Sequence, residues 1–349
     1  MPNWYAETFQ DLLIAIDANI REFINQHEHK APIFWHQIYE HFDYTYPDAR
    51  DNPDAMAAGK RIRPVLMAVV ARSLTGTYEH VLPAGIALEL IHNFTLIHDD
   101  IMDASDTRRG RTTIWKNYGI AQAIDTGDGL FSLGILSSLQ LDRAGNSAEK
   151  TLVASRELMQ ACLDTVEGQA LDISFEDRLD ITPEEYLKMI GLKTGRFIET
   201  AVRIGAYLST DDAQIIDNYA TYGKYLGLAF QMWDDYLGIW GDPEIIGKSA
   251  TGDIEQKKKS YPITYAFTHA DEVQQNRLRT IYNSQGTLTE ADVAEVLDIL
   301  DRVDARAKTQ AIVEDYYATA MNALDALALD NDDYNNLKQL AQFIIQRTY

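Results

Sequence analysis

Residues 96–103 read LIHDDIMD and close a long, largely apolar segment with the periodicity of a helix. Positions four apart share a helix face, so we expect Asp99 and Asp103 to point the same way, with Asp100 beside them. Like charges at this spacing repel each other, and a bound cation would offset the repulsion. Oxygen ligands of this kind suit Mg²⁺, which usually takes one or two protein carboxylates and completes its shell with water and phosphate oxygens.

A second acidic pair follows another apolar helical segment. Residues 230–238 read FQMWDDYLG and place Asp234 and Asp235 after the apolar run. Acids at helix ends are commonly solvated, which is the interpretation we favour for the pairs at 211–212 and 332–333. Asp234 and Asp235 differ because charges that follow a core-like stretch are expected to be paired or metal-bound.

Helical periodicity dominates the rest of the chain. Apolar residues recur three and four positions apart within 9–23, 187–204 and 293–303, while alternating strand patterns are scarce. The pattern predicts an all-α protein. No linker rich in Pro, Gly or Ser divides the chain, so we expect one domain over residues 1–349. Residues 1–58 carry no motif and are expected to form packing helices, with a dimer interface as one use for them.

Composition excludes several classes of protein. The 349 residues carry 53 acidic and 31 basic side chains, a net charge of −22, and the phosphate backbone of a nucleic acid would repel such a protein. The single cysteine, Cys162, fits a reducing compartment. Neither a signal peptide nor an uninterrupted membrane span is evident, so we expect a soluble, cytoplasmic protein with no integral membrane segment.

The basic residues are clustered. Twelve of the 31 lysines and arginines lie in four short segments, at residues 60–63, 108–111, 193–196 and 248–259. Arginine forks bind phosphate oxygens in bidentate fashion and lysine supplies a point charge. With acids that suit Mg²⁺, such clusters indicate a diphosphate held between metal and protein. Motifs for nucleotide binding or a protein nucleophile are absent.

Six short motifs occur in one order between Gly59 and Pro262. They are GKRIRP at 59–64, DDIMD followed by RRG at 99–110, GQALD at 168–172, KTG at 193–195, the pair at 234–235, and a lysine-bearing loop at 247–258. In this order they resemble the motifs of the trans-isoprenyl diphosphate synthase (polyprenyl synthetase) family. The resemblance implies an isoprenoid synthase fold, with helices around a deep central cavity, and usually a homodimer.

The resemblance also implies an enzyme, a Mg²⁺-dependent trans-prenyltransferase that condenses isopentenyl diphosphate with an allylic diphosphate. It implies three Mg²⁺ ions, bound by Asp99, Asp103 and Asp234 with support from Asp100 and Asp235. It implies isopentenyl diphosphate binding by Lys60, Arg63, His92 and Arg109, and allylic diphosphate binding by Arg108, Lys193, Lys248 and Lys258. Beside the reacting carbon it implies the catalytic residues Lys193, Thr194 and Gln231.

Two departures from the family pattern and two candidate chain-length residues stand out. Gly238 occupies the place of a third aspartate and Trp115 that of a histidine. The resemblance implies that bulky Phe94 and small Thr95, before Asp99, limit the product to geranylgeranyl diphosphate (C20). The alternative for Phe94 is an ordinary core aromatic. The alternatives for the function are a farnesyl or longer-chain synthase, a terpene cyclase, and a silent subunit of a heteromeric synthase.

Overall fold

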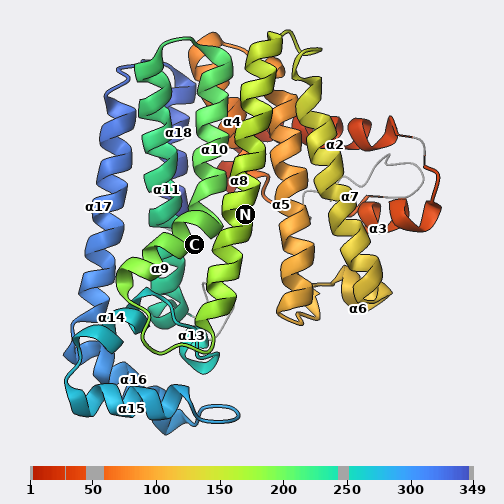
Figure 1. Ribbon diagram of the computed structural model, residues 1–349. Coiled ribbons are helices and arrows are strands. Elements are labelled where there is room, and N and C mark those ends of the chain that lie inside the picture. Colours follow the sequence, from red (N-terminus) through yellow and green to blue (C-terminus); the bar gives the residue numbers. More distant parts are fainter. Residues whose placement is uncertain (1–2, 28, 45–58, 243–250, 346–349) are drawn as a thin grey trace. The chain divides into compact units, whose positions relative to one another are not determined.

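The computed structural model describes residues 3–27, 29–44, 59–242 and 251–345 (Figure 1). The chain divides into two compact units. Unit 1 comprises Met1–Gln160, Thr200–Ile216 and Asp330–Leu337, and unit 2 comprises Ala161–Glu199, Asp217–Leu329 and Lys338–Tyr349. Most described residues are helical and only four lie in strands, so the predicted all-α class is confirmed. The expectation of a single domain over residues 1–349 stays a prediction.

Unit 1 holds the N-terminal helices, the segment that carries the first aspartates, and a short hairpin. Its elements are α1 (Asn3–Thr8), α2 (Gln10–Asn25), α3 (Pro32–Phe42), α4 (Ile62–Thr75), η2 (Glu79–Val81), α5 (Leu82–Met102), β1 (Thr107–Arg108), β2 (Arg111–Thr112), α6 (Ile114–Tyr118), α7 (Ile120–Ser138) and η3 (Leu139–Leu141). Helices α8 (Ala148–Phe175), α10 (Arg196–Ser209), α11 (Ala213–Trp240) and α18 (Asp332–Ile345) contribute residues to both units.

Unit 2 holds the second aspartate pair and the C-terminal helices. Its remaining elements are α9 (Pro183–Ile190), the π-helical turn η4 (Gly191–Gly195), α13 (Gly252–Glu255), α14 (Tyr261–His269), α15 (Glu272–Tyr282), α16 (Glu290–Arg302) and α17 (Ala305–Asp325).

Helix α5 is the central element of unit 1. It lies beside α7 (Figure 1) and also contacts α4 and α2. Gly134 permits the close approach of α7, because a Cβ there would lie 3.1 Å from the carbonyl oxygen of Ala87. Glu79–Met102 is the one span among the described residues that is long and apolar enough to cross a membrane, and 61% of its apolar window is buried in the structure. Such burial is typical of a core helix.

The described part of residues 1–58 forms helices α1 to α3. The predicted stripe of α2 is buried from Leu12 to Phe23, and α2 contacts both α4 and α5. These helices therefore pack onto the segments that carry the motifs of unit 1.

One feature of the fold was not predicted from the sequence. Strands β1 and β2 form an antiparallel hairpin with Thr107 opposite Thr112 and Arg108 opposite Arg111. Its two-residue turn has positive φ at both Arg109 (54°) and Gly110 (77°), as a tight hairpin turn requires. With two residues in each strand, the hairpin is too short to produce an alternating pattern.

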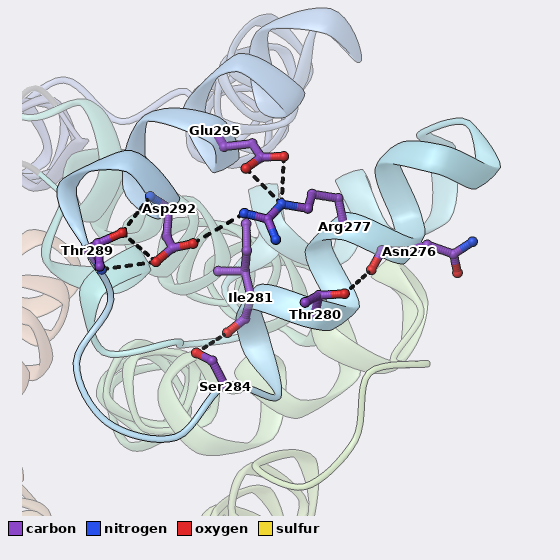
Figure 2. Close-up of polar contacts among 8 residues, drawn as sticks. All are labelled: Asn276, Arg277, Thr280, Ile281, Ser284, Thr289, Asp292 and Glu295. Atoms are coloured by element: carbon purple, nitrogen blue, oxygen red, sulfur yellow. Dashed lines mark hydrogen bonds and ion pairs between the residues drawn. The ribbon is translucent and has the colours of Figure 1, made fainter.

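Side-chain contacts join two helices of unit 2 at their polar surface. Figure 2 shows Arg277 on α15, whose Nε lies 2.7 Å from Glu295 Oε1 and whose Nη2 lies 3.4 Å from Asp292 Oδ1, both on α16. Asp292 also completes a capping box with Thr289 at the start of α16. The carboxylate of Asp292 therefore both caps the start of α16 and binds Arg277 on α15.

Candidate active site

The first three aspartates lie at the end of α5. Asp103 is the C-cap residue, and its backbone N–H donates to the carbonyl oxygen of Asp99 at 2.9 Å. Asp99 is half-buried and Asp103 is exposed, while Asp100 is buried and accepts a hydrogen bond from Arg108 Nε at 2.7 Å. Burial raises the pKa of Asp100, and Arg108 on β1 opposes that shift. The hairpin therefore engages Asp100, and Asp99 and Asp103 lie one turn apart on α5.

A cluster of basic side chains accompanies these acids in unit 1. Burial lowers the pKa of Arg63 to about 10, while the charge of Glu89 opposes this shift and that of Arg109 adds to it. Burial, followed by the charges of Arg63 and Arg109, lowers the pKa of His92 well below its usual value, so its imidazole is neutral at pH 7. Arg109 also lies against Gly59, where a Cβ would be 2.6 Å from Arg109 Nη1. Buried guanidinium groups beside a neutral imidazole offer N–H donors that suit an anionic ligand.

A buried polar network supports this basic cluster. Arg61, the left-handed N-cap residue of α4, donates from Nη1 to Glu89 Oε1 at 2.9 Å and from Nη2 to Asp17 Oδ1 at 3.3 Å. Asn93 Nδ2 donates to the Glu89 carbonyl oxygen at 2.7 Å, and Asn93 Oδ1 lies 2.9 Å from His41 Nε2. The network ties α2 and α3 to α4 and α5, and it holds the segment that bears Lys60 and Arg63.

The supporting residues were not predicted as part of the site. Glu89 interrupts the apolar run of α5. A single acidic residue in such a run indicates a buried partner of opposite charge or a hydrogen-bond donor. Asp17 and His41 come from the region without motifs. Burial lowers the pKa of His41 to about 4, so it is neutral at pH 7.

The residues of the second aspartate motif lie in unit 2. Asp235 is buried on α11 and accepts hydrogen bonds from Tyr186 Oη at 2.5 Å, the Tyr261 backbone N–H at 3.1 Å and Gln231 Nε2 at 3.2 Å. Burial raises the pKa of Asp235 to about 7, against the effect of these donors. Asp234, its neighbour, is exposed. As with Asp100 in unit 1, one acid of the pair is anchored by the protein.

The turn η4 carries Lys193 and Thr194. Thr194 Oγ1 donates to Gln231 Oε1 at 2.9 Å, and Lys193 Nζ lies 2.5 Å from Asp172 Oδ2 on α8. Gly168 allows α8 to approach this turn, because a Cβ there would lie 2.8 Å from Lys193 Cα. A π-helical turn inside a helical segment is rare and frequently marks a functional site.

Comparison with known proteins identifies the family. Residues 53–300 match the profile described as "Polyprenyl synthetase".

The chain belongs to the polyprenyl synthetase family.

Relatives agree with this membership. The chain is 31% identical over 304 residues to a "(2E,6E)-farnesyl diphosphate synthase" of Mycobacterium bovis, a match that covers 86% of this chain and 83% of the relative. It resembles the crystal structure of a geranylgeranyl pyrophosphate synthetase from Pyrococcus horikoshii Ot3, with 30% identity, 98% coverage of both chains and a TM-score of 0.85.

A second similar structure contains ligands. It is a polyprenyl synthase from Caulobacter crescentus CB15 "complexed with calcium and isoprenyl diphosphate", with 27% identity, a TM-score of 0.77, and coverage of 99% of this chain and 97% of that one. The expected family, the all-α isoprenoid synthase fold and the expected class of trans-prenyltransferase are confirmed.

The polyprenyl synthetase motifs fall into two sets, one in each unit. Unit 1 holds Lys60, Arg63, His92, Asp99, Asp100, Asp103, Arg108 and Arg109, and unit 2 holds Lys193, Thr194, Gln231, Asp234, Asp235 and Lys258. The contacts above join Asp100 to Arg108 in unit 1, and they join Thr194 to Gln231 and Gln231 to Asp235 in unit 2. The expectation of a single central cavity stays a prediction, and Lys248 lies outside the described residues.

Several of the clustered cations bind protein groups. Arg111 Nη1 lies 3.2 Å from Asp43 Oδ1, and Arg196 Nε lies 2.7 Å from Asp164 Oδ2. Lys257 donates to the carbonyl oxygen of Gly286 at 3.1 Å. Clustering in the sequence therefore does not separate cations that bind a ligand from cations that hold the fold.

The Trp115 departure has a structural explanation. Its indole Nε1 donates to the carbonyl oxygen of Ser105 at 2.8 Å, and Thr113 Oγ1 donates to the same oxygen at 2.9 Å. The tryptophan therefore ties the loop after Asp103 to α6. A histidine N–H could make the same kind of hydrogen bond, which explains why either residue fits here.

The candidate chain-length residues lie on α5 before Asp99. The ring of Phe94 is half-buried, with its centroid 5.5 Å from that of Phe131 on α7 and 4.8 Å from that of His98. Thr95 Oγ1 donates to the carbonyl oxygen of His92 at 2.8 Å. Phe94 is partly exposed, whereas a fully packed core aromatic would be buried.

Proposed function

We propose that this protein is a Mg²⁺-dependent synthase that condenses isopentenyl diphosphate with an allylic diphosphate to form geranylgeranyl diphosphate. The basic cluster beside the two aspartates of α5 is the observation that carries the proposal. Burial disfavours the charged guanidinium groups of Arg63 and Arg109, which lie beside a neutral His92, and a bound diphosphate would stabilise those charges. The calcium and isoprenyl diphosphate bound by the Caulobacter relative support the same ligand classes.

The aspartates fit a divalent cation that shares its shell with substrate. Among the residues that the structure describes, no three His, Cys, Asp or Glu side chains gather to hold a metal by themselves. Asp99 and Asp103 offer two carboxylates one turn apart, and Mg²⁺ needs only one or two when substrate phosphates supply the rest. We propose that Asp99, Asp103 and Asp234 are Mg²⁺ ligands, that Asp100 and Asp235 support them, and that three ions are present with substrate.

The remaining roles follow the chemistry of the side chains. Lys60, Arg63, His92 and Arg109 bind isopentenyl diphosphate, and Arg108, Lys193, Lys248 and Lys258 bind the allylic diphosphate. The bound cations supply charge neutralisation to the departing diphosphate. Thr194 and Gln231 turn oxygen dipoles toward the allylic cation that forms, and Lys193 stays near the leaving group. The double bond of isopentenyl diphosphate attacks that cation, and loss of a proton completes the product.

Further parts of the proposal concern assembly and location. Large apolar side chains are exposed along α7, at Ile120, Ile124 and Leu136, and at Leu139 in η3, and a second copy of the chain would cover such a surface. We propose a homodimer. The partners are small diphosphates, since the charge of −22 opposes nucleic acid, and the expected compartment is the cytoplasm.

One assay tests the activity. The pure protein is incubated with Mg²⁺, isopentenyl diphosphate and a C5, C10 or C15 allylic diphosphate, and the products are separated by chromatography. A C20 diphosphate from each active primer is expected. Release of a cyclic hydrocarbon would favour a terpene cyclase. Turnover only after a partner chain is added would favour a silent subunit, and C15 or longer diphosphates would correct the chain length.

Phe94 supplies a prediction within the same assay. Replacing Phe94 with alanine removes the ring that packs beside Phe131 and is expected to lengthen the product beyond C20, because the growing chain meets less obstruction. Mass spectrometry of the dephosphorylated products measures the shift. Phe131→Ala is the matched control for loss of aromatic packing at this contact. An unchanged product distribution for Phe94→Ala would show that Phe94 is only a packing residue.

A further inference from the structure

Gly238 leaves a space on α11 that another carboxylate fills. It lies one helical turn after Asp234, on the same face. A Cβ at residue 238 would meet the carboxylate of Asp253, with Cγ 2.5 Å and Oδ1 2.9 Å away. Asp253 belongs to the short helix α13 and lies against α11 where a side chain at residue 238 would stand. Helix α11 thus has no carboxylate of its own at residue 238, and the carboxylate of Asp253 from α13 lies there instead.

The backbone after Asp253 returns the chain to the same point. Lys258 N–H donates to the Asp253 carbonyl oxygen at 2.9 Å, and Lys257 N–H donates to the Ile254 carbonyl oxygen at 2.8 Å. Lys257 has a left-handed φ of 53°, and together these features form the closing turn that commonly ends a helix. Ile254 is fully buried in the core of unit 2 and anchors the turn.

This turn brings the Lys258 side chain to Asp253. Nζ of Lys258 lies 3.2 Å from Asp253 Oδ1, and the side chains are 56% and 15% exposed, respectively. Burial lowers the pKa of Lys258, but the charge of Asp253, its hydrogen bond to Lys258 and the charges of Asp234 and Asp235 together outweigh burial. The pKa therefore lies above its usual value, and the ammonium keeps its proton. An ammonium has three N–H donors, so a ligand can still bind to Lys258 while it contacts Asp253.

We propose that Asp253 is a positioning residue, whose carboxylate occupies the space left by Gly238 and orients Lys258 toward the allylic diphosphate. The inference rests on the proposed function. A lysine side chain is long and flexible, so holding it in place lowers the entropy lost when it binds an anion. A side chain at residue 238 would force the Asp253 carboxylate to shift and would disturb its contact with Lys258. Adding a carboxylate at residue 238, which would bring the chain closer to the family pattern, should therefore weaken the site.

Isothermal titration of the full-length protein with inorganic diphosphate, in the presence of Mg²⁺, tests the pairing. Asp253→Asn and Gly238→Asp are each expected to weaken binding about fivefold to tenfold, because a partly exposed charge-assisted contact is lost. The double variant Gly238→Asp/Asp253→Ala moves the carboxylate from α13 to α11 and should restore the affinity to within about twofold. Glu255→Gln, a charge-matched change on the same helix, should leave the affinity unaltered.

Steady-state kinetics adds a readout that a purely structural role would not give. The KM for the allylic diphosphate should rise in Asp253→Asn while the KM for isopentenyl diphosphate stays the same. If Asp253→Asn fails to fold, as judged by circular dichroism, Gly238→Ala crowds the same carboxylate without removing it and replaces that variant. Unchanged diphosphate affinity in the single variants, or no recovery in the double variant, would overturn the inference. Failure of the unaltered protein to make any prenyl diphosphate would instead reject the proposed function.

Discussion

Replacing Asp99 with alanine is expected to lower kcat about a thousandfold, the largest change in activity that we predict. Asp99 lies on the last turn of α5, on the same face as Asp103, and we assign both to the divalent cation. Metal-ion stabilisation of a departing oxygen is worth several kcal/mol, and a loss of about 4 kcal/mol corresponds to about a thousandfold in rate. The measurement is kcat with saturating substrates and Mg²⁺.

Asp106→Ala is the matched control for this variant. Asp106 lies in the loop that follows α5, and its exposed carboxylate pairs with Lys116 at 2.9 Å. Exposed ion pairs of this kind contribute little, so the control should retain kcat within about twofold. A second readout is the affinity for Mn²⁺ in the presence of inorganic diphosphate, which should fall in Asp99→Ala only. Retention of kcat and of Mn²⁺ affinity in Asp99→Ala would contradict the assignment.

Glu89→Gln is expected to destabilise the fold by about 3–5 kcal/mol, the largest change in stability that we predict. Glu89 and Arg61 have side chains only 4% and 3% exposed, and their contact at 2.9 Å lies in the interior of unit 1. Loss of the glutamate charge leaves the buried guanidinium with Asp17, which is 3.3 Å away, as its remaining anionic partner. Urea denaturation followed by circular dichroism measures the difference in the free energy of unfolding.

The control for Glu89→Gln is the same substitution, glutamate to glutamine, at an exposed position. Glu149, in the first turn of α8, is exposed, and Glu149→Gln should change the free energy of unfolding by less than about 1 kcal/mol. We also expect Glu89→Gln to raise the KM for isopentenyl diphosphate, because Arg61 separates Lys60 from Arg63. Equal stability of the two variants would show that the buried pair is not needed.

Much of the local structure could be predicted from the sequence. Residues 182–185 read TPEE, a sequence typical of a helix start, and Thr182 and Glu185 form a capping box in which each bonds to the other's backbone. The apolar stripe of α2 is buried, and the acids of both motifs lie on the helices expected for them. These features depend on residues three or four positions apart, so the periodicity of a helix is enough to predict them.

Contacts between distant residues could not be predicted in this way. The partners Arg61 and Asp17 are 44 positions apart, and His41 and Asn93 are 52 apart. Asp253 fills the space at Gly238 because α13 and α11 pack together, and no spacing rule relates the two positions. The two-residue strands of the hairpin are likewise too short to leave a pattern, although their turn sets Arg108 against Asp100.

The sequence by itself determined the helical class, the order of the motifs and the family, because each depends on residue types at short spacing. Only the tertiary structure decided which charged residues are partners within a unit. It assigned Asp100 to Arg108, Glu89 to Arg61 and Asp253 to Lys258. The physical reason is that a buried charge must find an opposite charge or a hydrogen-bond donor, and packing of distant segments determines which one lies within reach.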